Sequence, residues 1–274
     1  MRRPFEQVDV FSADYRGNPV AVVLDAQGLT AAQMQRFARW TNLSETTFVL
    51  PATRRTADYR VRIFTPVGEL PFAGHPTLGT CHAWLRSSGE DADEVVQECA
   101  AGLVRVRRTP DTLAFAAPPL IRGGDVEAGE LATIRDILGV RYTQVLAAQW
   151  VDNGPGWVAV LLDSVDTLLG LTPGQLGGYF LGAAALHDTG GPADLEVRAF
   201  FDAGGVTVED PVTGSLNASL APWLVAAGYL GFPYTARQGS AIGRDGRVLL
   251  SRDADGTVWV GGRVVTAITG TVEL

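Results

Sequence analysis

An internal repeat constrains the fold of this chain more than any other feature of the sequence. Early in each half, a turn is followed by a valine-rich segment ending in Leu-Asp and then by a segment that begins Leu-Thr. Four landmarks recur at similar distances: Asp25 and Asp163 are 138 positions apart, Thr30 and Thr172 142, Arg62 and Arg198 136, and Gly74 and Gly214 140. This period is longer than that of solenoid repeats, so we expect two homologous lobes with a cleft between them.

Strands and helices follow from the spacing of apolar residues. Alternation predicts strands through most of both halves, for example at 59–64, 103–106, 247–250 and 257–260. Helical spacing predicts helices at 30–40, 76–85, 130–138 and 216–227, and the second Leu-Thr segment predicts a further helix over 173–180. The segments 76–85 and 216–227 are apolar on nearly all faces, so each should be enclosed by the strands of its own lobe.

The predicted fold class is therefore α+β, with two pseudo-symmetric lobes, each a curved sheet or barrel around a central helix. We expect an N-terminal lobe at 1–117, to which the last strand near 263–274 returns, and a C-terminal lobe at 118–262.

Composition narrows the classes of function. The net charge of −8 and the pI of about 4.9 disfavour nonspecific binding to nucleic acid or to an anionic membrane. The sequence contains no uninterrupted run of about 18 apolar residues, the length needed to span a bilayer. Two cysteines, Cys81 and Cys99, are too few for a disulfide framework and lack zinc-site spacing. We expect a cytoplasmic protein without a metal.

Both predicted central helices begin after a glycine in a polar segment. The first segment runs from Ala73 through Gly74 and His75, and the second runs from Asp210 to Gly214 and Ser215. Unpaired N–H groups at a helix N-terminus favour an anion, which suggests a small carboxylate substrate. Taken singly, His75 could be a capping or core histidine, and Ser215 an N-cap. We interpret the two remaining histidines, His82 and His187, as structural.

Two carboxylates stand out by position. Glu45 lies between the predicted helix 30–40 and a strand beginning near Phe48, and Asp210 precedes the second glycine-opened helix. Each is more commonly a solvated loop charge, as is Glu209 beside Asp210. The spacing alone does not decide between these interpretations.

The chain resembles the PhzF-like family of phenazine biosynthesis over nearly its whole length. The segments that carry the resemblance are Gly17–Val22, Met34–Val49, Arg62–Gly79, Asn153–Pro155, Val208–Ser215, Gln238–Gly239 and Gly243–Arg244. The resemblance implies a diaminopimelate-epimerase-like fold, usually dimeric, with the active site between the lobes and no metal or organic cofactor. The family's phenazine enzyme isomerises dihydrohydroxyanthranilate by shifting a proton along its ring.

The resemblance also implies roles for individual residues. Glu45 would carry the proton, His75 and Asp210 would be its polar partners, and the substrate cradle would include Gly74, Gly214 and Ser215. A glutamate in this role needs a pKa raised toward neutrality, which a poorly solvated cleft could provide.

Related racemases on this fold use two thiols, one beside each glycine-opened helix. Here Ala73 and Thr213 precede the two glycines, so chemistry with two thiols is disfavoured. Departures from the family pattern at Gly68, Trp157, Leu216 and Asn217 leave the substrate open. Two alternatives to the isomerase also stay open: a PhzF-like hydrolase of a related metabolite, and a noncatalytic protein that binds a small acid.

Overall fold

The computed structural model describes all 274 residues, and they divide into two compact units. Unit 1 comprises Met1–Ala116 and Gly261–Leu274, and unit 2 comprises Ala117–Val260. Strand β17 (Val258–Gly262) crosses the limit between them in sequence. None of the helices combines the length and the apolar character that crossing a bilayer requires.

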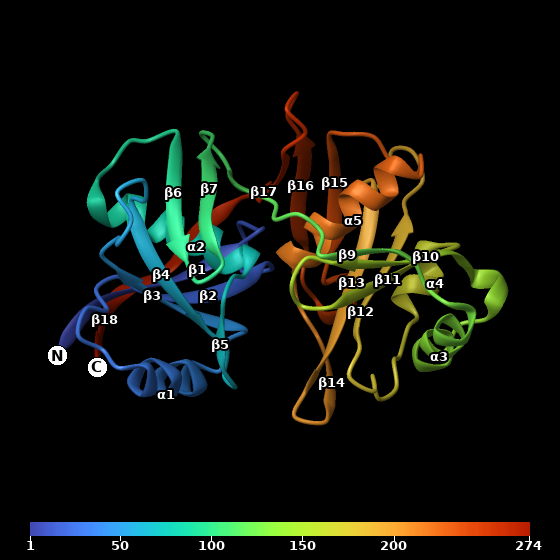
Figure 1. Cartoon of the computed structure of the whole chain (residues 1–274), viewed down its shortest axis with the longest axis horizontal. Coiled ribbons are helices and arrows are strands. Elements are labelled where there is room, and N and C mark those ends of the chain that lie inside the picture. Colours follow the sequence, from blue (N-terminus) through green and yellow to red (C-terminus); the bar gives the residue numbers. More distant parts are fainter. The chain divides into compact units, whose positions relative to one another are not determined.

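Unit 1 contains one mixed sheet and two helices (Figure 1). Its elements are β1 (Arg2–Val10), β2 (Asn18–Val23), α1 (Ala31–Thr41), β3 (Glu45–Leu50), β4 (Tyr59–Phe64), β5 (Glu69–Leu70), α2 (Gly74–Ser88), β6 (Glu94–Cys99), β7 (Gly102–Arg108), β8 (Leu113–Ala116) and β18 (Val264–Glu273). Since β18 pairs with β1, the final strand lies in the same unit as the first. The N-terminal ammonium donates to the carbonyl of Leu274 at 2.6 Å, so the two ends of the chain are adjacent.

Unit 2 contains its own series of parallel and antiparallel strand pairs, with three helices and two short 3-10 helices. Its elements are β9 (Arg122–Asp125), α3 (Ala128–Leu138), η1 (Tyr142–Gln144), β10 (Val145–Asp152), β11 (Trp157–Leu162), α4 (Val165–Leu169), β12 (Phe180–Leu186), β13 (Leu195–Ala203), β14 (Val206–Glu209), α5 (Gly214–Ala226), β15 (Tyr234–Gln238), η2 (Ser240–Ile242) and β16 (Gly246–Arg252).

Strand pairing repeats between the units and confirms the duplication. In unit 1, β2 pairs with β1 antiparallel and with β3 parallel, β3 with β4 antiparallel, and β4 with the hairpin strand β5 and, in parallel, with β6. Unit 2 uses the same directions in the series β10, β11, β12, β13, β14 and β15. Helices α2 and α5 occupy equivalent places in the chain order: α2 follows the hairpin β4–β5 and precedes β6, and α5 follows the hairpin β13–β14 and precedes β15.

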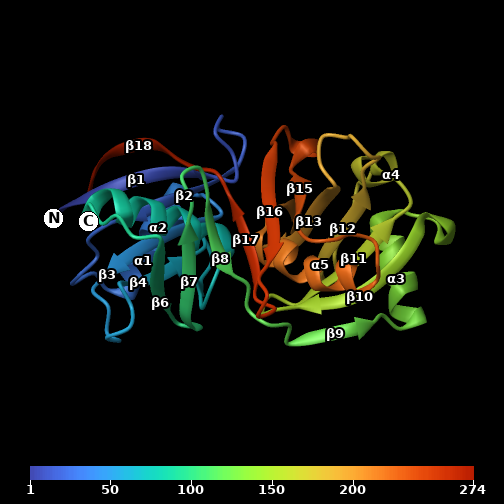
Figure 2. The ribbon, with the colours of Figure 1, turned by 90° about the horizontal axis from the view of Figure 1, so that it is seen from above.

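Helices α2 and α5 are buried in their own units, as their apolar composition predicts. Helix α2 contacts β1, β2 and β3, and α5 contacts β10 and β16 (Figure 2). The close approach of α2 to β2 requires a glycine at position 79, because a Cβ there would lie 2.3 Å from a methyl of Val20. The sheet face opposite the central helix is covered by α1 in unit 1 and by α3 and α4 in unit 2, in each unit over an apolar cluster.

An Arg–Glu pair spans the hairpin before each central helix. Arg62 Nε lies 2.7 Å from Glu69 Oε1, and Arg198 Nε lies 3.1 Å from Glu209 Oε1; both pairs are bidentate. Each glutamate precedes its helix-opening glycine by five residues. Glu209 is thus an internal structural partner of Arg198, and not a solvated loop charge.

The helix predicted over 173–180 is wrong. Residues 173–179 form a loop with a turn at Gly177 and Gly178, Phe180 begins β12, and the short helix α4 ends before the segment. The two glycines have φ of 61° and 89°, values that L side chains rarely adopt. Pro173 and three glycines in eight residues explain why helical spacing does not become a helix here.

Candidate active site

Glu45 is the first residue of β3, and not a loop residue before it. Helix α1 ends at Thr41 and is capped by Asn42, whose left-handed backbone conformation (φ 54°) turns the chain toward the strand. In the parallel pairing of β2 with β3, Glu45 lies opposite Val20, near the start of both strands. The carboxylate is largely buried, with 14% of its side chain exposed.

His75 is the second residue of α2, and 5% of its side chain is exposed. Ala73 occupies the N-cap position and offers no side-chain oxygen to the first N–H groups of the helix. His75 Nε2 lies 3.2 Å from Glu45 Oε2. The structure therefore brings together three of the predicted residues of unit 1, namely Glu45, Gly74 and His75.

The contact between Glu45 and His75 is close in distance but poorly aligned for a hydrogen bond. Hydrogen bonds in proton-transfer sites are commonly long or misaligned without substrate. Burial lowers the pKa of His75 to about 3, so its ring is neutral near pH 7. A neutral imidazole can donate or accept one hydrogen bond beside the carboxylate without changing the net charge of the pair.

The buried state of His75 should make stability depend on pH. A histidine in the unfolded chain titrates near pH 6.5, so between about pH 3 and 6.5 the unfolded state binds more protons. The free energy of unfolding should then rise with pH by at most about 1.4 kcal/mol per unit from this residue. His75→Gln should flatten that rise in denaturant unfolding across this range. An unchanged slope would contradict the lowered pKa.

Behind His75, a polar network fixes the first turn of α2. Thr77 Oγ1 donates to the carbonyl of Ala73 at 2.9 Å and accepts from Gln97 Nε2 at 2.8 Å. Tyr59 donates in turn to Gln97 Oε1 at 3.0 Å. Gln97 and Thr77 are fully buried, so these bonds replace water at polar groups inside the unit.

Asp210 lies just after β14, four residues before α5. Thr213 Oγ1 donates to Asp210 Oδ2 at 2.5 Å, and Gln238 Nε2 donates to Thr213 Oγ1 at 2.9 Å. Gln238 Oε1 accepts from the backbone N–H of Thr213 at 3.0 Å and from Asn217 Nδ2 at 2.9 Å. Asp210 is therefore oriented by a buried network that also fixes the first turn of α5.

Gly214 opens α5, and Ser215 is its second residue, equivalent in position to His75. Ser215 is not the N-cap, because Thr213 occupies that position without bonding the first N–H groups. Asn153 Nδ2 donates to the carbonyl of Ser215, and Trp157 Nε1 donates to its Oγ, both at 3.0 Å. Asp210, Gly214 and Ser215 thus gather at one helix end in unit 2, as Glu45, Gly74 and His75 do in unit 1.

The glutamines that support both helix ends were not among the residues predicted from the sequence. Gln97 in β6 and Gln238 in β15 are 141 positions apart, and their partners Thr77 and Asn217 are 140 apart. These offsets match those of the repeat, which is the signal that could have found them. Asn217, a departure from the family pattern, is thus fully buried and belongs to this network.

Neither cysteine is suited to act as a base. Both are free thiols, and Cys81 is completely buried in α2. Burial raises the pKa of Cys81 to about 12 and also raises the pKa of Cys99. A reactive thiol needs a stabilised thiolate, which both positions disfavour. The raised pKa values thus also disfavour two-thiol chemistry, as the residues before the two glycines do.

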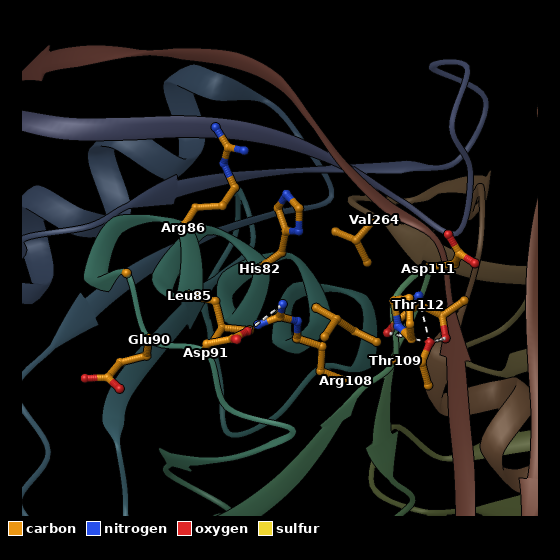
Figure 3. A pocket seen from close by; sticks show the side chains of 13 residues that line it. His82, Leu85, Arg86, Glu90, Asp91, Arg108, Thr109, Asp111, Thr112 and Val264 are labelled. Atoms are coloured by element: carbon orange, nitrogen blue, oxygen red, sulfur yellow. Dashed lines mark hydrogen bonds and ion pairs between the residues drawn. The ribbon is translucent and has the colours of Figure 1, made fainter.

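A pocket of about 470 Å³ in unit 1 lies away from these residues (Figure 3). It is formed by the C-terminal half of α2, the turn between β7 and β8, and Val264. His82 lines it, with Nε2 3.0 Å from Thr266 Oγ1, while Arg108 pairs with Asp91 at 2.9 Å. Because neither Glu45 nor His75 lines this pocket, it is not the candidate active site.

The fold and the two helix ends define a protein of the diaminopimelate-epimerase-like class. A solved PhzF-family phenazine biosynthesis protein from Bacillus anthracis superimposes with a TM-score of 0.86, covering 100% of both chains at 24% identity. The chain belongs to the PhzC-PhzF family, whose model, described as phenazine biosynthesis-like protein, matches residues 8–270.

Two curated relatives match along nearly their whole length. The trans-2,3-dihydro-3-hydroxyanthranilate isomerase of Pseudomonas fluorescens is 37% identical over 279 residues, covering 97% of this chain and 98% of the relative. The Schizosaccharomyces pombe protein named antisense-enhancing sequence 1 is 34% identical over 289 residues, covering 97% of both.

Proposed function

We propose that the protein is an isomerase that moves a proton between two carbons of a small, unsaturated, amino-acid-like carboxylate. Glu45 breaks a carbon–hydrogen bond by taking the proton, the electron pair shifts along the conjugated system, and the same carboxyl group returns the proton to another carbon. Atoms and electrons balance without an oxidant, a reductant or an added water molecule. The relative named for the isomerisation of dihydrohydroxyanthranilate supports this reaction class.

One observation carries the proposal: a largely buried carboxylate, Glu45, beside a neutral, buried imidazole at the start of a central helix. A carboxylate removed from water is a stronger base, because burial disfavours its charged form. The His75 ring adds a donor or acceptor without a second charge. In unit 2, at the N-terminal end of α5, we assign Asp210 to the catalytic set and Ser215 to substrate binding.

The two helix ends suit an anionic substrate. The first N–H groups of α2 and α5 donate no hydrogen bond to the side chain of the N-cap residue. Such groups, together with the helix dipole, stabilise a carboxylate or a developing enolate. Gly74 and Gly214 carry no side chain that would separate a ligand from the backbone at these positions. Cytoplasmic location remains a prediction from the composition, and a homodimer remains a prediction from the family resemblance that light scattering tests.

Product analysis tests the proposed function. The enzyme is incubated with trans-2,3-dihydro-3-hydroxyanthranilate and with related unsaturated amino acids, and substrate and product are compared by mass and NMR. We expect a product of unchanged mass in which a double bond has moved. A product heavier by one water would identify a hydrolase instead, and tight binding without turnover of any acid would indicate a binding protein.

A further inference from the structure

The polar contacts of Ser215 assign a direction to its hydroxyl group. The indole N–H of Trp157 donates to Ser215 Oγ at 3.0 Å, and an indole nitrogen can only donate. The oxygen of Ser215 is therefore the acceptor in this contact. Its own hydrogen is left to donate to a group other than Trp157.

The indole of Trp157 is held in place by its packing and by the loop that precedes it. It begins β11, is 3% exposed, and packs edge-on against Phe180 with ring centroids 5.4 Å apart. In the loop before it, Asp152 Oδ1 accepts from the N–H groups of Gly154 and Gly156, both at 2.7 Å. These glycines have φ of 143° and 92°, which a residue with a side chain rarely adopts. The loop therefore presents the indole in one place.

The same loop also fixes the backbone of Ser215. Asn153 Nδ2 donates to the Ser215 carbonyl at 3.0 Å, and Ser219 Oγ donates to it at 2.9 Å. Asn153 is 8% exposed, and its side-chain oxygen accepts no hydrogen bond. Ser215 thus lies in the first turn of α5, where hydrogen bonds from Asn153 and Ser219 fix its carbonyl and the bond from Trp157 fixes its Oγ.

The face of the sheet on which these groups lie follows from the alternation of β12. A Cβ on Gly182 would meet Leu216 of α5 at 2.5 Å, so Gly182 points toward the helix. Phe180, two residues earlier, points to the same face. Trp157 and Phe180 therefore form an aromatic wall beside the start of α5, and this wall offers no acceptor to the hydroxyl group of Ser215.

We propose that Trp157 is a positioning residue that determines specificity: by donating to Ser215 Oγ, it commits the Ser215 hydroxyl to donate to an anionic group of the substrate. This rests on the proposed function and assigns the recognition of the substrate carboxylate. A hydroxyl group free to rotate could either donate or accept and would discriminate less between an acid and its amide. The Trp157 contact removes that freedom, so the site selects a charged acceptor.

The test uses Trp157→Phe, which keeps an aromatic ring against Phe180 and removes the donor together with the second ring of the indole. Calorimetry compares the binding of 2-aminobenzoate and 2-aminobenzamide, an acid and an amide of the same shape. We expect acid binding to weaken about 3- to 10-fold while amide binding changes less than twofold. For the reaction, KM of the acid substrate should rise by the same factor with kcat nearly unchanged.

A double-mutant cycle separates positioning from general damage. If Trp157 acts through the hydroxyl group, the double variant Trp157→Phe, Ser215→Ala should bind the acid no more weakly than Ser215→Ala alone. Equal weakening of acid and amide, or effects that add in full, would overturn the inference. So would a wild type that binds neither compound. If the phenylalanine variant does not fold, Ser215→Ala alone must remove the preference for the acid.

The outcomes also distinguish this inference from the proposed function. A wild type that prefers the acid but converts no substrate defeats the proposed isomerase and leaves the Trp157 assignment intact. Normal turnover with an unchanged ratio of acid to amide binding in Trp157→Phe defeats the assignment alone.

Discussion

Glu45→Gln is expected to reduce turnover of the isomerase substrate by about 10²- to 10⁴-fold, the usual contribution of one acid/base group. The substitution keeps the shape and polarity of the side chain beside His75 but removes its ability to accept a proton. Because Glu45 lies within 3.2 Å of a buried imidazole, a carboxamide there can still form a hydrogen bond. We expect KM to change little, since the loss concerns the chemical step.

Glu69→Gln provides the matched control. Glu69 belongs to the same unit and lies five residues before α2, but its carboxylate pairs with Arg62 and is 37% exposed. Partly exposed pairs contribute little to stability, so this variant should fold and keep wild-type turnover. Steady-state kinetics on both purified variants and the wild type measures the loss of turnover in each. A Glu45→Gln enzyme within threefold of wild type would remove Glu45 from the mechanism.

Gln238→Leu is expected to destabilise the protein by about 2–5 kcal/mol. The Gln238 side chain is fully buried and makes hydrogen bonds to Thr213, Asn217 and the carbonyl of Asp210. Leucine has a similar volume but no polar atom, so the Thr213 N–H and one N–H of the Asn217 amide would be left buried without an acceptor, while the Asn217 amide keeps its bond to the Thr213 carbonyl. Such groups keep the full cost of desolvation.

Denaturant unfolding of Gln238→Leu and Gln27→Leu measures this effect. Gln27 is exposed, so its replacement should change the free energy of unfolding by less than about 0.5 kcal/mol. Since Gln238 also orients Thr213 beside Asp210, the folded fraction of Gln238→Leu should bind 2-aminobenzoate more weakly. Equal stability of the two variants would show that the network contributes nothing to the end of α5.

Much of the fold could be predicted from the repeat. The offsets between Asp25 and Asp163 and between Gly74 and Gly214 identify the equivalent elements of two lobes with the same strand pairing. The apolar character of the central helices predicts their burial, because a helix without a polar face has no side for water. The helix predicted over 173–180 does not form, because the proline and glycines of this segment override the spacing of its apolar residues.

The candidate site was less predictable than the fold. Glu45 and His75 are separated by 30 positions, and only the resemblance to a family linked them before the structure placed them 3.2 Å apart. A single glutamine in a strand, such as Gln97 or Gln238, has the pattern of an outward-facing polar residue. Its partners are set by the three-dimensional position of a helix end, which periodicity does not contain.

Hydrogen exchange with solvent tests the central role of Glu45 most directly. The wild-type enzyme, Glu45→Gln and Glu45→Asp are each incubated with the accepted substrate in deuterium oxide, and deuterium on carbon is measured by mass spectrometry and NMR. We predict deuterium at the carbon that receives the proton with the wild type, slower labelling with Glu45→Asp, and none above the enzyme-free blank with Glu45→Gln. Labelling by Glu45→Gln at the wild-type rate would contradict the mechanism.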